Sequence, residues 1–176
     1  MKNKFLRYGV VLFIIAAVSA GALAFINKIT LPIIRENDRK TQDEARAAVL
    51  AEAKEFKISE KKEVENLEFI PGYDGDKLVG YVTTVTVKGY GGPVAYMLGI
   101  TLDAKVAGLK VVSSSETPGL GDKINGEEWQ KHWKGANSEY GFTKTVDAFA
   151  GATISPTAVY SGIIRTLTLF KKEVNK

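Results

Sequence analysis

The chain has 176 residues, one histidine and no cysteine, which allows one domain of ordinary size plus an appendage. These counts exclude disulfides, thiolate metal sites, iron–sulfur ligation by this chain and a multi-histidine metal centre, so we expect no metal site. The formal net charge of +4 comes from Lys2, Lys4, Arg7 and Lys28, and the remainder is electrically balanced, which argues against a nucleic-acid partner.

The first predicted element is a membrane helix. No residue from Tyr8 to Asn27 is charged, and a helix of that length covers roughly the 30 Å hydrocarbon core of a bilayer. A cleaved signal peptide is the alternative, because Ala22-Leu23-Ala24 resembles a processing site. Apolar residues continue beyond that site, which favours a retained single-pass anchor. We therefore expect residues 1–30 to form a cytoplasmic N-terminus and anchor, and residues 31–176 an extracytoplasmic domain.

After Pro32, the pattern predicts a second helix over residues 41–56. Thr41 and Glu44 have the spacing of a capping box at its start. Small apolar residues follow at helical intervals, namely Ala45, Ala48, Val49, Ala53 and Phe56. This composition is typical of a helix that packs on a sheet and carries no chemistry.

Residues 67–112 change to the two-residue period of strands. Alternation in residues 78–87 places Val79, Tyr81, Val85 and Val87 on one face, and two further strands follow in residues 95–103 and 108–115. Turns are expected at Pro71-Gly72, at Asp74-Gly75 and in the loop of residues 88–93. The predicted fold class is α+β, an antiparallel sheet packed with helices.

Two glycine-rich loops interrupt this pattern. Residues 89–92 read Gly-Tyr-Gly-Gly, which is most simply a tight turn between strands. Residues 116–121 read Glu-Thr-Pro-Gly-Leu-Gly, which is longer than a hairpin needs and predicts a stiff shelf beside a ligand.

A final helix is predicted from Pro156 to about Lys172, with Ser155 as its cap. Its buried side is expected to comprise Val159, Ile163, Ile164, Leu167 and Phe170. Thr153 stands just before this helix, where free backbone N–H groups and the helix dipole favour an anion such as phosphate. A threonine in this place is also commonly a plain capping residue.

Two motifs then carry a resemblance. Residues 147–153, Asp-Ala-Phe-Ala-Gly-Ala-Thr, resemble the flavinylation motif Asp-x-x-(Ser/Thr)-Gly-Ala-Thr of the FMN-binding domain family. This family is found in the G subunit of the Rnf complex and in the C subunit of the sodium-pumping NADH:quinone oxidoreductase. The motif in residues 116–121 matches a second family motif, in the expected order and behind a single anchor. The short chain is more similar to an Rnf G subunit than to the longer homologue.

The resemblance implies a covalent FMN cofactor, joined through its phosphate to the hydroxyl of Thr153 by a transferase that uses FAD as donor. It implies a binding site that comprises Gly151, Ala152, Asp147 and Ser155 around the acceptor, and the shelf of Glu116, Thr117, Pro118, Gly119, Leu120 and Gly121 beside the isoalloxazine ring. Asp147 would serve recognition by the transferase or order the turn. No independent catalytic residue is expected, because the flavin supplies the redox chemistry.

One position departs from the motif, since Ala150 replaces its Ser/Thr residue. This change removes a possible hydrogen bond to the transferase or to the flavin phosphate, but attachment is expected to survive because Thr153 is present. His132 is interpreted as a partly packed surface imidazole. Trp129 and Trp133 belong to an aromatic cluster with Tyr140 and Phe142, for which ordinary packing is favoured over shielding of a flavin.

The predicted function is electron transfer within a membrane ion-translocating ferredoxin:NAD oxidoreductase of Rnf type, with the other membrane subunits of that complex as partners. The equivalent subunit of a sodium-pumping NADH:quinone oxidoreductase remains an alternative, as does a cofactor-free membrane-anchored binding module. A hydrolase with a serine or threonine nucleophile is disfavoured, because the sequence lacks a Gly-x-Ser-x-Gly elbow.

Overall fold

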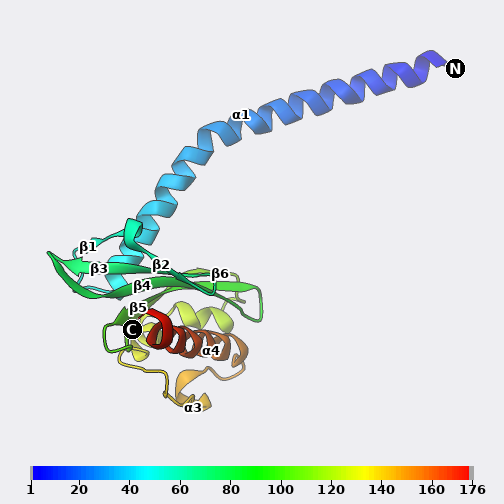
Figure 1. Cartoon of the computed structure of the whole chain (residues 1–176). Coiled ribbons are helices and arrows are strands. Elements are labelled where there is room, and N and C mark those ends of the chain that lie inside the picture. The colour runs from blue at the N-terminus through cyan, green and yellow to red at the C-terminus, as the bar shows by residue number, and fades with distance from the viewer. Residues whose placement is uncertain (1, 175–176) are drawn as a thin grey trace. The chain divides into compact units, whose positions relative to one another are not determined.

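The computed structural model describes residues 2–174 of the chain. The chain divides into two compact units, Met1–Thr41 and Gln42–Lys176. The helix α1, Lys2–Val49, provides all of the described part of the first unit and the beginning of the second (Figure 1). The predicted boundary between anchor and domain at residue 30 stays a prediction.

Within the described residues, α1 is the one helix that is long and apolar enough to cross a membrane. Every described side chain from residue 5 to residue 41 is exposed, including large apolar ones such as Phe13 and Phe25. An apolar helix surface without packing partners fits a membrane anchor.

The predicted break at Pro32 and the helix start at Thr41 are wrong, because both residues lie inside α1. The capping signal is overridden because the preceding turn of helix already supplies acceptors for these backbone N–H groups.

The second unit is built on an antiparallel sheet in the order β1-β3-β4-β5-β6, with β2 paired to β3. The strands are β1 (Glu55–Phe56), β2 (Lys62–Val64), β3 (Leu67–Asp74), β4 (Lys77–Lys88), β5 (Pro93–Thr101) and β6 (Val106–Ser114). Strands β3 to β6 follow one another as hairpins, as predicted from the alternation and from the turns expected at Asp74-Gly75 and in residues 88–93. The α+β fold class with a leading apolar helix is confirmed.

Two details of the strand prediction are wrong. Pro71-Gly72 is not a turn but the middle of β3, where Gly72 makes room for Leu50 and Ala53: a Cβ at that position would lie 2.8 Å from each. Val79 does not share a face with Tyr81. The register between β3 and β4 shifts at this point, so Val79 is an extra residue that packs with the opposite core.

The two faces of the sheet carry separate hydrophobic cores. On one face, the last turns of α1 pack Ala45 and Val49 against Val82 and Met97. The backbone of Val49 lies so close to β5 and β6 that a Cβ at Gly108 would stand 2.8 Å from its carbonyl oxygen. The prediction that this helical segment packs on the sheet is confirmed. Its predicted end is wrong, because the helix ends at Val49 and Phe56 belongs to β1.

The larger core lies on the other face, under α4 (Ile154–Leu169) (Figure 1). The predicted buried side of this helix is fully buried at four positions, Val159, Ile163, Leu167 and Phe170, and Ile164 is partly exposed. The chain continues in the wider turns of η3 (Phe170–Val174). Gly162 faces the Tyr96 hydroxyl so closely that a side chain would collide with it.

The short helices η2 (Gly121–Asn125), α2 (Glu127–His132) and α3 (Lys144–Asp147) complete this layer, whereas η1 (Ile58–Glu60) lies beside β3 and has no buried residue. Trp129 and Trp133 are buried in the larger core and contact each other edge to face with ring centroids 5.5 Å apart. Tyr140 and Phe142 pack against the same core. The interpretation of this aromatic cluster as ordinary packing is therefore confirmed.

Candidate functional site

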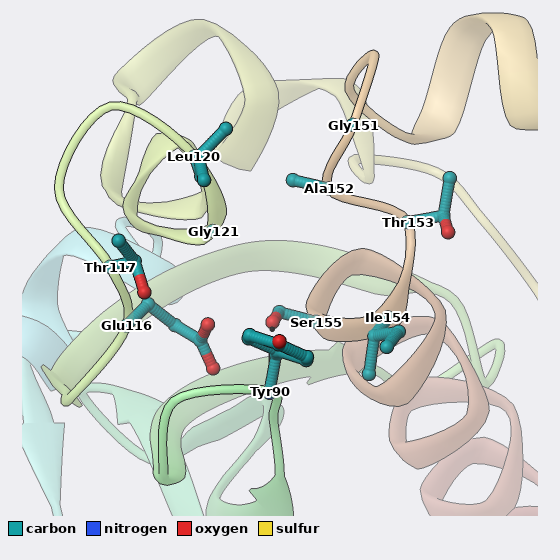
Figure 2. A pocket seen from close by; sticks show the side chains of 10 residues that line it. All are labelled: Tyr90, Glu116, Thr117, Leu120, Gly121, Gly151, Ala152, Thr153, Ile154 and Ser155. Atoms are coloured by element: carbon teal, nitrogen blue, oxygen red, sulfur yellow. Dashed lines mark hydrogen bonds between the residues drawn. The ribbon is translucent and has the colours of Figure 1, made fainter.

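Three segments far apart in the sequence meet at a half-open pocket of about 280 Å³ beside the first turn of α4. They are the loop between β4 and β5, the segment that follows β6, and the turn that leads into α4 (Figure 2). The residues that line it are Tyr90, Glu116, Thr117, Leu120, Gly121, Gly151, Ala152, Thr153, Ile154 and Ser155. The two motifs singled out in the sequence thus form opposite walls of one pocket.

The first wall is organised around Glu116, a buried carboxylate with 8% of its surface exposed. Both of its side-chain oxygens lie 3.3 Å from the backbone nitrogen of Gly91, whose N–H donates to them. A Cβ at Gly89 or at Gly121 would collide with these oxygens. Glycine at both positions thus leaves room for two backbone segments to close around the Glu116 carboxylate.

The opposite wall is a tight turn. The N–H of Ala152 donates to the carbonyl of Phe149 at 3.0 Å, which leaves Ala150 and Gly151 as the two central residues. Gly151 has φ +79°, a left-handed conformation that a residue with a side chain adopts only at a cost. The turn delivers Thr153 to the N-cap position of α4.

Thr153 is exposed and its side chain makes no capping hydrogen bond. Only its carbonyl is engaged, accepting from the N–H of Thr157 at 3.1 Å and from the hydroxyl of Thr157 at 2.7 Å. In Figure 2 the Thr153 hydroxyl points outward from the rim of the pocket. The interpretation of Thr153 as a plain capping residue is wrong, because the hydroxyl is not used by the helix.

Ser155 does not cap the helix as predicted but lies inside its first turn, where it is buried. Its Oγ accepts a hydrogen bond of 3.2 Å from the backbone N–H of Tyr90. This bond joins the loop between β4 and β5 to the start of α4, so Ser155 fixes one corner of the pocket.

Asp147 lies outside the pocket lining and is completely buried. Its carboxylate accepts hydrogen bonds from the backbone N–H of Thr143 at 2.5 Å and from the Tyr140 hydroxyl at 2.8 Å, and it pairs with His132 Nε2 at 2.6 Å. Its backbone carbonyl accepts from the Trp129 indole at 2.8 Å. These contacts tie α2 and α3 to the start of the motif, which supports a role in ordering the turn.

Burial alone would raise the pKa of Asp147, but the hydrogen bonds from Thr143, Tyr140 and His132, together with the charge of His132, outweigh it and lower the pKa below its usual 3.8. Burial and the same carboxylate raise the pKa of Tyr140 to about 12. The His132 side chain is 32% exposed, which confirms the partly packed imidazole and adds a carboxylate partner that the sequence did not indicate.

The structure brings together most of the predicted site residues but not all. Pro118 and Gly119 lie in the same loop as Glu116 without lining the pocket, and Asp147 lies behind the turn. Tyr90 and Ile154 line the pocket and were missed. The only signal for Tyr90 was its place between glycines, which favoured a plain turn. That these residues bind a cofactor stays a prediction.

Comparison with known proteins agrees with this architecture. The model of the FMN-binding domain matches residues 89–168, which include all three segments of the pocket, and the model of the RnfG N-terminal region matches residues 1–49. The crystal structure of NqrC from Shewanella oneidensis superposes with a TM-score of 0.51 over 70% of each chain, at 19% identity. The fold is therefore that of an FMN-binding domain.

The relatives narrow the family further. The chain is 33% identical to the G subunit of the Na⁺-translocating ferredoxin:NAD⁺ oxidoreductase complex of Acetobacterium woodii, over 94% of this chain and 91% of that relative. It is 28% identical to the G subunit of the proton-translocating complex of Clostridium ljungdahlii, over 83% and 80% respectively. The chain belongs to the G subunits of Rnf-type ion-translocating oxidoreductase complexes, within the FMN-binding domain family.

Proposed function

We propose that this chain relays electrons within a membrane ion-translocating ferredoxin:NAD⁺ oxidoreductase, through FMN joined by a phosphoester to Thr153. The observation that carries the proposal is the Thr153 hydroxyl, which stands exposed at the helix N-terminus beside the pocket and takes no part in capping. A threonine that served the fold would use this hydroxyl on the backbone N–H groups of the first turn.

The residues of the pocket fit a flavin. Its walls combine the apolar side chains of Leu120 and Ile154 and the ring of Tyr90 with polar groups at Glu116 and Ser155, a mixture typical of cofactor sites. Figure 2 shows Tyr90 on one side of the pocket, with Leu120 and Ala152 across from it, which leaves a slot for a flat ring. Its volume of about 280 Å³ lies just below the usual range of ligand pockets, which begins at about 300 Å³.

The N-terminus of α4 suits the phosphate of this cofactor. Its first turn carries no acidic residue, and the N–H groups of Ile154 and Ser155 have no acceptor within the helix. These groups and the helix dipole favour a negative charge beside Thr153. In the attachment step, the Thr153 oxygen would attack the flavin-side phosphorus of FAD, break the pyrophosphate bond and lose its proton, with AMP as leaving group. The transferase would supply the activation, because a threonine hydroxyl alone is a weak nucleophile.

Bound FMN would accept electrons singly or in pairs, and this chain would hold the ring, tune its potential and keep it from diffusing away. The apolar helix α1 would anchor the subunit beside the other membrane subunits, as the names of the relatives support. The excess of basic residues before the uncharged span that begins at Tyr8 supports a cytoplasmic N-terminus and an extracytoplasmic flavin domain, residues 31–176.

The test is the intact mass of the full chain, purified in detergent after expression with an FAD-dependent flavin transferase. The wild type is expected to gain the mass of one FMN less one water, and Thr153→Ala to gain nothing. Thr157→Ala is the matched control, since it removes an exposed threonine hydroxyl one turn along the same helix. We expect it to remain flavinylated.

Three results would contradict the proposal: an unmodified wild type, a modified Thr153→Ala, or a yellow cofactor that is released when the chain is unfolded. The same spectrum tests the anchor. A retained helix gives the mass of the complete chain, whereas a cleaved signal peptide removes the residues before the processing site.

A further inference from the structure

The Glu116 carboxylate is buried in the pocket wall, and few hydrogen-bond donors surround it. It receives one backbone N–H, that of Gly91, shared between both oxygens at 3.3 Å. N–H···O hydrogen bonds in proteins commonly measure about 2.7–3.2 Å between nitrogen and oxygen, so this contact is long. In the part of the chain that the structure describes, no lysine, arginine or histidine pairs with Glu116.

Burying an ionised carboxylate costs free energy unless donors satisfy its oxygens, which together offer about four acceptor positions. The surrounding backbone is shaped to hold this one side chain, because Gly89 and Gly121 lack the Cβ atoms that would collide with it. A site that is built around a carboxylate but gives it one long hydrogen bond is missing a donor. The open side of Glu116 faces the pocket, so the donor would come from a ligand.

The identity of this donor rests on the proposed function, in which FMN occupies the pocket. Two parts of FMN can donate hydrogen bonds, the imide N3–H of the ring and the hydroxyls of the ribityl chain. The ribityl chain is bonded to the phosphate and therefore starts at Thr153, which lies across the pocket from Glu116 in Figure 2. The ring reaches farther from that attachment point, and its imide is the one ring N–H available in oxidised flavin.

We propose that Glu116 accepts a hydrogen bond from the imide N3–H of the flavin and places a fixed negative charge beside its pyrimidine ring. The contact selects a ring with an N–H at that position. The charge disfavours the reduced flavin, whose pyrimidine carries more negative charge, and so keeps the flavin a stronger electron donor.

The experiment compares the flavinylated full chain with its Glu116→Gln variant in detergent, with flavin labelled by ¹⁵N-riboflavin. At a fixed ambient potential, the ratio of reduced to oxidised flavin is expected to rise about tenfold in Glu116→Gln, since one unit charge a few ångström away is removed. The N3–H proton resonance is expected far downfield in the wild type and to move upfield in the variant. Glu139→Gln, which neutralises an exposed glutamate outside the pocket, is the control.

A merely structural Glu116 would change the stability of the loop without moving the reduced-to-oxidised ratio or the imide resonance, and that result overturns the inference. Should the variant fail to fold, the wild type alone still decides: an N3–H that exchanges with water as fast as in free flavin overturns it. Mass spectrometry separates the two claims. A wild type without flavin overturns the proposed function, and this inference with it.

Discussion

Asp147 and Thr153, the two polar ends of one seven-residue motif, are treated in opposite ways by the fold. Asp147 is completely buried and its carboxylate has three hydrogen-bonding partners. Thr153 is exposed and its hydroxyl caps nothing. Substitution of these two residues should therefore cost very different free energies, because Asp147 is a buried charge satisfied by its neighbours, whereas the Thr153 hydroxyl has no partner among the described residues.

Within the motif, some residues maintain the fold, whereas Thr153 is left free of structural contacts through its hydroxyl. Asp147 holds α2, α3 and the start of the turn together, and Gly151 bends the chain so that Thr153 arrives at the helix N-terminus. The turn is therefore held in place by these buried contacts, while Thr153 on its outer side stays exposed. Unfolding free energies of variants can test these different roles of Asp147 and Thr153. Both tryptophans of the chain, Trp129 and Trp133, lie in the larger core, so their fluorescence reports on the unfolding of this unit.

The largest effect is expected for Asp147→Asn. The substitution keeps the shape but removes the charge that His132, Tyr140 and Thr143 satisfy, and it should lower the unfolding free energy by about 3 kcal/mol. The measurement is denaturant unfolding of the full chain in detergent, followed by tryptophan fluorescence. Asp76→Asn, in the exposed turn between β3 and β4, is the control and should change little.

The same variant decides between the two roles considered for Asp147. Under conditions where Asp147→Asn is folded, we expect Thr153 to be flavinylated, because the carboxylate lies outside the pocket. A folded variant that the transferase does not modify would instead show that Asp147 serves recognition.

Acid should remove the contribution of the Asp147 carboxylate to the unfolding free energy. Its pKa is lowered in the folded chain, so the stabilisation is complete above the unfolded pKa of about 3.9 and is lost as pH falls through the folded value. The gap in unfolding free energy between wild type and Asp147→Asn should therefore narrow below about pH 4. Unfolding curves at about pH 6, 5, 4 and 3 measure it. A gap that stays constant or widens in acid would contradict the assignment.

A smaller effect is expected for Tyr140→Phe. The variant keeps the ring packed against Trp133 but removes the hydroxyl that donates to Asp147, at a cost of about 2 kcal/mol. Tyr73→Phe removes a hydroxyl that donates to Glu60 at the surface and should cost less than about 0.5 kcal/mol. Equal losses of unfolding free energy in the two variants would mean that the buried hydrogen bond to Asp147 stabilises the fold no more than the exposed one to Glu60.

The features of the pocket that depend only on neighbouring residues in the chain could be predicted from the sequence. The turn with Gly151, the helix after Thr153 and the shelf at Glu116 are read from short stretches of chain. It failed where distant residues decide. The pairing of His132 with Asp147 and the approach of Tyr90 to Ser155 depend on packing between segments that no spacing records.

The same limit explains the errors in the fold. The capping box at Thr41 is a real local signal, but the helix of the preceding segment continues through it. Pro71-Gly72 has turn-forming residues, yet Gly72 is needed because Leu50 and Ala53 press on β3 from another part of the chain. Each local preference was overridden by a neighbour that only the folded chain brings near.

Thr153→Val should leave stability unchanged within about 0.5 kcal/mol in protein made without the transferase, because no hydrogen bond of the hydroxyl is lost. Ser155→Ala, two residues along, removes an acceptor that is buried against the N–H of Tyr90 and should cost about 1 kcal/mol. Denaturant unfolding of both variants measures the contrast. A larger loss for Thr153→Val than for Ser155→Ala would show that Thr153 serves the fold after all.

The smallest effect is expected for Ala150→Ser, which restores the hydroxyl of the family motif. Ala150 is exposed at the centre of the turn, so stability should stay within about 0.5 kcal/mol of the wild type. One solvent-exposed hydrogen bond is worth little, and the rate of flavinylation should therefore rise by less than about fivefold. Time courses of flavin attachment measure this rate.

Gly151→Ala changes the neighbouring residue, whose φ is +79°, and is the comparison variant. It should change the rate of attachment by a larger factor than Ala150→Ser, and in the direction of slower attachment, because it strains the turn that presents Thr153. If Ala150→Ser had the larger effect of the two, a hydroxyl at position 150 and not the shape of the turn would control delivery of Thr153.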